Sequence, residues 1–280
     1  MIAISTREGA FRMIKKCILL LLSLLLLTGC APAESIPTEA PRQPETVAVP
    51  PTETLPPTSP PETAAPTEVP TLPPHSELYI DGLSVEDVIL YFNEVCLDAE
   101  FVNAGNPSYL QKWISPISYF VSGIPTEDDL ETLKRFTRWL NELDGFPGIV
   151  ETGDVASANL RIYFCDEQEL LDLMGDQFYG TDGAVTFWYA DDIIYDAVIC
   201  IRTDLDQTLR NSVILEEVYN GLGPVQDTDL RPDSLIYSGF SQPQELTEID
   251  ELILKLLYHP ELKCGMDAAA CEAVIRKLYY

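Results

Sequence analysis

The sequence predicts an α/β (α+β) fold, with one mixed β-sheet packed against helices, over residues 77–280. Two observations predict this class. Apolar residues recur at helical spacing in several segments that begin with helix-capping side chains. Short runs rich in Ile, Val, Tyr and Phe lie between those segments and read as strands. Strands that alternate with helices are typical of a layered sandwich, and the region has the length of a single domain.

The expected helices begin at side chains that accept backbone hydrogen bonds from the first turn. Four of them start with a capping-box pattern, in which a Ser, Thr or Asp precedes an acidic residue by three positions. The pairs are Ser84 and Asp87, Thr126 and Asp129, Asp166 and Glu169, and Thr247 and Asp250. Two further helices are expected from about Gln207 to Asn220 and after Asp267.

The expected strands are short apolar runs bounded by turn residues. They cover Ile117–Val121, Leu160–Phe164, Gly183–Tyr189 and Ile194–Arg202, and the last two are joined at the turn Asp191-Asp192. The stretch from the end of the 207–220 helix to about Leu246 shows neither period, so we expect it to be irregular.

Residues 1–29 have the pattern of a bacterial lipoprotein signal peptide. Two lysines precede an apolar run from Cys17 to Leu27, whose 11 residues are too few to span a bilayer, since a helix needs roughly 20. The run ends in Leu27-Thr28-Gly29-Cys30, which resembles the lipobox, so Cys30 is the expected site of lipidation, with palmitate among its acyl chains. Met13 is an alternative start to Met1.

Residues 30–76 read as a disordered linker between the lipid and the domain. Of the 22 prolines, 14 fall within residues 31–76, together with eight threonines. Proline removes backbone donors and fixes φ, so neither a helix nor a sheet propagates, and extended polyproline II is favoured. A plain spacer is the main interpretation; a proline-motif ligand and a glycosylated stalk are the alternatives.

The charge balance excludes some classes of partner. The chain carries 17 basic and 45 acidic residues, a net charge of −28. A protein this acidic is not expected to bind nucleic acid, because phosphate contacts need clustered Lys and Arg. Anionic headgroups would also repel it, so we expect the membrane contact to be made by the lipid on Cys30 alone.

The segment Ile214–Gly223 resembles the active-site helix of the zincin metalloproteases, which carries two His ligands four residues apart and a catalytic Glu. In the metzincin branch a Gly and a third His follow. On this chain the ligand positions fall on Glu216, Asn220 and Gln226, the base position on Glu217, and the turn glycine on Gly223. Ser234-Leu235-Ile236-Tyr237 is similar to the Met-turn, with Ile236 in place of the methionine.

A closer resemblance is to the bacterial family called domain of unknown function 2927. It covers most of residues 108–266 and rests on six short blocks in the same order. These blocks are Leu215-Glu216-Glu217 to Gly223, Pro232-Asp233-Ser234, Leu246-Thr247, Asp250, Leu257-Tyr258-His259-Pro260 and Gly265-Met266. The resemblance implies a zincin-like fold with degenerate ligands, and it implies no activity.

The metal positions do not predict a zinc site. Open zinc sites usually take three protein ligands, of which imidazole is the commonest, and none of the three positions here is His. We therefore expect no metal and no cofactor, and Glu217 is only a weak catalytic candidate because it has no metal-bound water to activate. Two alternatives stay open: a solvated face or an ion pair with Arg202 or Arg210, and an oxygen-ligand Ca²⁺ or Mg²⁺ site of Glu216, Glu217, Asp227 and Asp229.

The remaining reactive residues give no catalytic pattern. There is no nucleophile elbow, phosphate loop or dinucleotide fingerprint. His259 is expected at the surface, and Cys96, Cys165 and Cys200 are expected to be buried as small apolar residues. A disulfide between Cys264 and Cys271 is an option outside the cytoplasm.

Together these patterns predict an extracytoplasmic, lipid-anchored protein of the bacterial cell envelope. We expect its domain to serve non-catalytic binding or scaffolding, with an envelope protein or peptide as partner, through a cleft around Glu217, Asn220 and Tyr237. The alternative is a hydrolase acting on peptide or cell wall, which would use Glu217 with a non-histidine metal site or with no metal.

Overall fold

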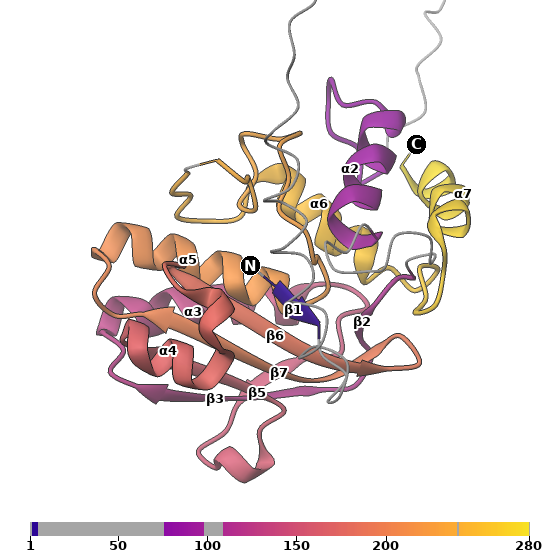
Figure 1. The fold of residues 1–280 in the computed structure, drawn as a ribbon. Helices are drawn as coiled ribbons and strands as arrows, with labels where there is room; N and C mark the ends of the chain where they lie inside the picture. The colour runs from indigo at the N-terminus through magenta and orange to yellow at the C-terminus, as the bar shows by residue number, and fades with distance from the viewer. Residues whose placement is uncertain (1, 5–75, 98–108, 240, 280) are drawn as a thin grey trace, which may run out of the picture. The chain divides into compact units, whose positions relative to one another are not determined.

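The computed structural model describes residues 2–4, 76–97, 109–239 and 241–279 (Figure 1). The chain divides into two units, one of Met1–Met13 with His75–Tyr280 and the other of Ile14–Pro74. The second unit lies outside the described residues, as do the core of the predicted signal peptide, Cys30 and nearly all of the predicted linker.

A seven-stranded mixed sheet forms the centre of the domain, in the order β1-β6-β7-β5-β3-β4, with β2 paired to β7. The strands are β1 (Ile2–Ile4), β2 (Lys112–Trp113), β3 (Ile117–Gly123), β4 (Ile149–Glu151), β5 (Leu160–Cys165), β6 (Gly183–Ala190) and β7 (Ile193–Arg202). Only β6 and β7 pair antiparallel, while the other pairs are parallel. The predicted mixed sheet is confirmed, and β1, β2 and β4 are additions to it.

The turn between β6 and β7 explains their antiparallel pairing. Asp191 and Asp192 both have positive φ, at 51° and 60°. Tight hairpin turns of this kind match the twist of the flanking strands, and Asp tolerates the left-handed region better than most residues.

The helices of the domain agree with the capping patterns of the sequence. They are α2 (Val85–Leu97), α3 (Glu127–Glu142), α4 (Glu167–Met174), α5 (Gln207–Asn220), α6 (Glu248–Leu257) and α7 (Ala268–Leu278). Short 3-10 turns lie at Val155–Ser157 and Asp176–Phe178. Complete capping boxes are present at Thr126 with Asp129 and at Asp166 with Glu169. Among the described residues, no helix has the length and apolar character needed to cross a membrane.

The two faces of the sheet bury different side chains, because successive residues of a strand point to opposite sides. Val185 and Phe187 of β6 belong to the large core that α5 covers, together with Ile199 of β7. Ala184 and Cys200 belong to a smaller cluster beneath α4, with Leu170 at its centre.

The helices α2, α6 and α7 lie together at one side of the sheet (Figure 1). Their apolar faces join the same large core, which includes Phe92, Leu254 and Ile275. The amino group of Lys112 donates to the carbonyl oxygen of Leu257 at 2.6 Å, which the end of α6 leaves open, and to that of Leu262 at 2.5 Å in the segment that follows α6. Burial lowers the pKa of Lys112 to about 8.

Candidate functional site

A pocket of about 220 Å³ lies where α5 crosses the start of β6. The loop that follows α5 closes its third side. The lining residues are Thr181, Asp182, Gly183, Leu209, Ser212, Val213, Glu216, Glu217, Asp227, Tyr237, Ser238, Gly239 and Ser241. Four of them carry carboxyl groups and none is Lys or Arg, so the lining is acidic.

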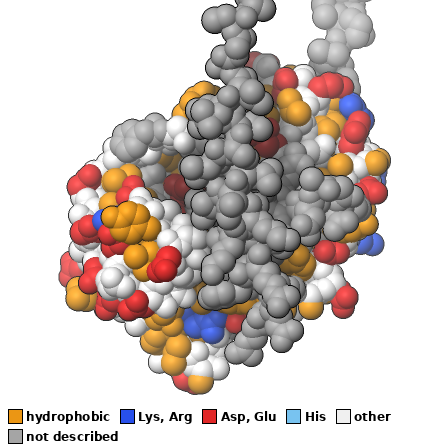
Figure 2. All heavy atoms as spheres, viewed as in Figure 1, with side chains coloured by type: hydrophobic (Ala, Val, Ile, Leu, Met, Phe, Trp, Pro, Cys, Tyr) orange, Lys and Arg blue, Asp and Glu red, His pale blue; other side chains and the backbone are white. Residues whose placement is uncertain are grey.

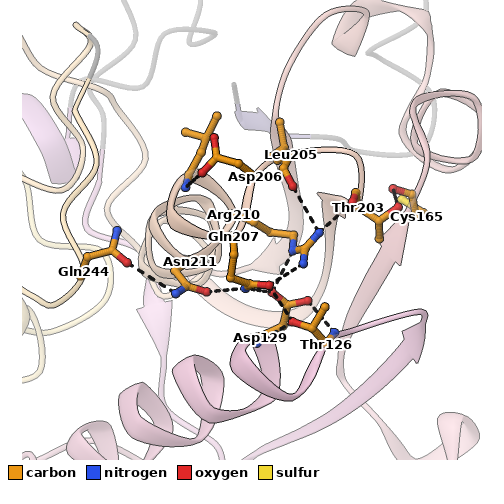
Figure 3. Close-up of polar contacts among 11 residues, drawn as sticks. Thr126, Asp129, Cys165, Thr203, Leu205, Asp206, Gln207, Arg210, Asn211 and Gln244 are labelled. Atoms are coloured by element: carbon orange, nitrogen blue, oxygen red, sulfur yellow. Dashed lines mark hydrogen bonds and ion pairs between the residues drawn. The ribbon is translucent and has the colours of Figure 1, made fainter.

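A buried ion pair fixes the first turn of α5 against α3 (Figure 3). Arg210 Nε donates to Asp129 Oδ1 at 2.9 Å, and Gln207 Nε2 donates to the same oxygen at 2.6 Å. Arg210 also donates to the carbonyl oxygen of Thr203 at 2.7 Å. Although burial opposes it, hydrogen bonds from Thr126, Gln207 and Arg210 hold the pKa of Asp129 below its usual value. This cluster sets the direction in which α5 runs toward the pocket.

Glu217 lies on the face of α5 that meets the sheet, with only 3% of its surface exposed. A Cβ atom on Gly183 would stand 2.8 Å from Glu217 Cγ and 2.5 Å from Val213 Cγ1, so β6 approaches α5 this closely only because residue 183 is glycine. The Oε2 atom of Glu217 is buried without a hydrogen-bond partner among the described residues. A buried polar atom without a partner is costly in free energy.

The solvated or ion-paired reading of Glu217 is wrong. Arg210 pairs with Asp129, and Arg202 pairs with Glu167 at 3.2 Å and Asp204 at 2.6 Å. Both guanidinium groups are therefore engaged by carboxylates other than that of Glu217. The side chain of Glu217 lines the pocket, where the cleft was expected, and it is also buried against the core.

The loop after α5 is held in place by its own backbone bonds. Thr228 and Tyr237 form a parallel β-bridge. The amide of Thr228 donates to the carbonyl oxygen of Ile236 at 2.9 Å, and the amide of Ser238 donates to that of Thr228, also at 2.9 Å. This bridge brings Asp227 and Tyr237 to the same wall of the pocket.

A buried chain of hydrogen bonds supports the bridge from beneath. Tyr91 Oη on α2 donates to Ser234 Oγ at 2.6 Å, and Ser234 Oγ donates to Asp250 Oδ1 at 2.7 Å. Asp250 Oδ2 also accepts from the Leu235 amide at 3.0 Å and from Thr247 Oγ1 at 2.7 Å. Two of the sequence blocks noted above, around Ser234 and around Asp250, therefore meet in one structural contact.

The carboxyl groups of Glu216, Glu217 and Asp227 have raised pKa values. Burial is the main cause for Glu216, and the charge of Asp227 adds to it, so the pKa of Glu216 rises to about 7. Burial raises the pKa of Glu217 well above its usual value and also raises that of Asp227. A cation in the pocket would remove this cost, because an opposite charge favours the ionised form.

The other expected site residues lie away from the pocket lining. Asn220 is 1% exposed, and neither atom of its amide has a partner among the described residues. Gln226 Oε1 is likewise buried and unpaired. Asp229 accepts a hydrogen bond from Ser238 Oγ and does not line the pocket. Of the three positions compared with zinc ligands, only Glu216 reaches it, and of the three expected cleft residues Glu217 and Tyr237 do, while Asn220 does not.

No group of three or more His, Cys, Asp or Glu side chains in the described part of the chain has an arrangement that could hold a metal ion. The carboxylates of the pocket therefore do not converge on one point.

Sequence reasoning missed the part of the pocket that β6 supplies. Asp182 and Gly183 come from the start of this strand, and Ser212 from the first half of α5. The available signal was a glycine at the first position of an apolar strand, which indicates a close approach of another backbone or helix.

Four apolar residues of α5 and of the loop after it are buried, namely Leu215, Val218, Leu222 and Ile236. Gly223, at the expected turn, has φ of +137°, and a Cβ there would stand 2.7 Å from the carbonyl oxygen of Gln111.

The expected thiol burial is also confirmed for Cys96, Cys165 and Cys200. Cys264 and Cys271 are both free thiols in the structure, so the optional disulfide between them is not formed. His259 is half-buried, and its Nδ1 accepts from the amide of Glu261 at 3.2 Å.

The acidic composition is visible on the surface, where Asp and Glu side chains outnumber Lys and Arg over the visible face (Figure 2). A family model described as "Protein of unknown function (DUF2927)" matches residues 86–277. A search of curated proteins found no similar sequence.

Proposed function

Since the chain belongs to the DUF2927 family of proteins of unknown function, its family supplies no activity, and we propose a function from the pocket and the sequence together. The protein is a lipid-anchored binding protein of the bacterial cell envelope, held to the membrane through Cys30. Its domain holds a cationic group of its ligand, an ammonium or guanidinium, in the pocket between α5 and β6.

The observation that carries this proposal is the unpaired carboxylate of Glu217. Its Oε2 atom is buried without a partner among the described residues, in a pocket whose other acids are Glu216, Asp227 and Asp182. Burial and the neighbouring acids raise the pKa values of Glu216 and Glu217, so the pocket disfavours their ionised forms. An organic cation relieves the repulsion and gives Glu217 a hydrogen-bond donor.

The hypothesis that the domain has a zincin-like scaffold with replaced metal ligands is consistent with this proposal. The positions of the lost ligands fall on Glu216, Asn220 and Gln226, and only the first of them lines the pocket. In this interpretation, the helix that holds the metal in zincins carries carboxylates here, and these carboxylates bind an organic cation.

A hydrolase is the second candidate, because a buried Glu with a raised pKa is typical of a general acid or base. This alternative predicts turnover of a peptide or cell-wall substrate that is abolished by Glu217→Gln. The binding proposal predicts that the same variant loses affinity and that the parent protein turns over nothing.

The test uses the mature chain from Cys30 in detergent and n-butylammonium chloride as the probe. Thermal unfolding should shift upward with n-butylammonium and not with sodium chloride at equal ionic strength. Glu217→Gln should remove the shift, and Glu131→Gln, an exposed glutamate on α3, should retain it. An equal shift with sodium chloride, or an unchanged shift in Glu217→Gln, would contradict the proposal.

A further inference from the structure

The edge strand next to the pocket is covered by the chain's own first residues. β1 pairs parallel with β6, with Ile2 opposite Val185, Ala3 opposite Thr186 and Ile4 opposite Phe187. Without β1, β6 would be an edge of the sheet, since its other side pairs with β7. An uncovered edge presents unpaired backbone donors and acceptors and is a template for another strand.

The sequence indicates that β1 is absent from the mature protein. Residues 2–4 lie within the segment 1–29, which is expected to be cleaved before Cys30. Cleavage would open the backbone of β6 from Val185 to Phe187. The side chains of Val185 and Phe187 belong to the large core, so an added strand meets β6 mainly through its backbone.

The direction of β1 connects this edge to the pocket. In parallel pairing both strands run the same way, so the amino end of β1 lies at the end of β6 that begins with Gly183. Gly183 lines the pocket and stands against Glu217. A strand that adds to β6 in the same register therefore directs its own amino terminus toward the carboxylates of Glu216, Glu217 and Asp227.

We propose that the mature protein binds the free amino terminus of an extended peptide, which adds to β6 as a parallel strand and places its α-ammonium in the pocket. This inference rests on the proposed cation pocket and names the class of ligand that fills it. Backbone pairing gives affinity with little dependence on side chains. The ammonium group determines the direction in which the peptide binds, because the acidic lining attracts its positive amino end and repels its carboxylate end.

The first part of the test compares peptides on the mature chain from Cys30. The probe is the hexapeptide of residues 1–6, Met-Ile-Ala-Ile-Ser-Thr, with a free amino terminus. Its N-acetylated form should bind at least about tenfold more weakly, because the charge that meets the carboxylates is gone. Equal binding of both forms would overturn the inference.

The second part tests the strand pairing. Successive residues of a strand direct their backbone groups to opposite sides, so only alternate amides face β6. N-methylation at one of peptide positions 3 and 4 should weaken binding at least about tenfold, and methylation at the other should change it by less than about threefold. Equal effects of the two methyl groups would overturn the proposed pairing.

The third part uses the protein itself. The precursor that retains residues 1–29 should bind the hexapeptide at least about tenfold more weakly than the mature chain, because β1 already covers β6. If n-butylammonium binds as expected and no peptide does, this inference fails while the cation pocket stands. If the peptide binds with the N-methyl pattern but equally well when acetylated, the placement of the amino terminus in the pocket is wrong.

Discussion

Single residues decide whether the pocket exists, and Gly183 and Glu217 are the two that matter most. The glycine lets β6 approach α5, and the glutamate fills the space that a Cβ atom would occupy. Position 217 was found from the sequence because it falls on a recognisable helix pattern. Its burial was not predicted, because burial depends on Gly183, which lies 34 positions earlier in the chain and packs directly against Glu217 from the start of β6.

Gly183→Ala should destabilise the domain by about 1–3 kcal/mol, because the new methyl group would overlap Val213 and Glu217 in a packed interior. Urea unfolding followed by circular dichroism measures the change. Gly153→Ala is the matched control, since a Cβ there meets nothing within 4 Å, and it should stay within about 0.5 kcal/mol of the parent. Equal stability of the two variants would mean that Gly183 does not stand against α5.

The raised pKa of Glu216 makes stability depend on pH. The folded chain holds a proton on Glu216 up to about pH 7, whereas an ordinary Glu releases it near 4.5. The stabilisation is complete below pH 4.5 and is lost as the pH rises to about 7. Melting temperatures across this range should fall with rising pH, and Glu216→Gln should flatten the fall. The control Glu131→Gln should show the same fall in melting temperature as the parent. Identical melting temperatures of the parent and Glu216→Gln across this pH range would refute the raised pKa of Glu216.

At the scale of elements, the sequence predicted those helices and strands whose formation depends on neighbouring residues in the chain. The first residues of α3 and α4 follow from capping boxes, each contained within four successive residues, and both capping boxes are present in the structure. The strands β2 and β4 have two and three residues, so no periodicity identifies them. The strand β2 forms because it pairs with β7, and β4 forms because it pairs with β3. Such pairing depends on the tertiary fold and cannot be seen in the local sequence. The loop after α5 was expected to be irregular, and its order comes from distant partners, Tyr91 and Asp250.

Ser234→Ala should therefore cost about 1–3 kcal/mol, because it leaves Tyr91 Oη and one oxygen of the buried Asp250 with fewer partners. Chemical denaturation gives the magnitude. Ser238→Ala, an exposed serine in the same loop, should be nearly neutral. If both serine variants unfold at the same denaturant concentration, the hydrogen-bond chain does not hold the loop.

At the scale of the whole molecule, the acidity of the chain and its predicted anchor belong together. A chain with a net charge of −28 is expected to be repelled by anionic headgroups, so we expect lasting association with a membrane to need a separate attachment. A single fatty-acyl chain gives only marginal binding, and stable anchoring takes more than one. Composition and the lipobox resemblance together are enough to predict this arrangement, because neither depends on the fold.

Cys30→Ser should release the protein from the membrane fraction and abolish incorporation of labelled palmitate, because the thiol that accepts the lipid is gone. Fractionation with immunoblotting and radiolabelling gives both readouts. Cys264→Ser is the control and should leave label and location unchanged. Retention of the Cys30→Ser protein in membranes without label would refute lipid anchoring.

The burial of the cysteines also makes them natural reporters of motion. Cys96, Cys165, Cys200 and Cys271 are enclosed, whereas Cys264 is only half-buried. An alkylating reagent should therefore modify Cys264 rapidly and reach the other four only when the surrounding structure opens. The rates at these four positions would separate opening beneath α4, where Cys165 and Cys200 lie, from opening of the large core. The cysteines of the domain can therefore show whether the cluster beneath α4 or the large core opens first.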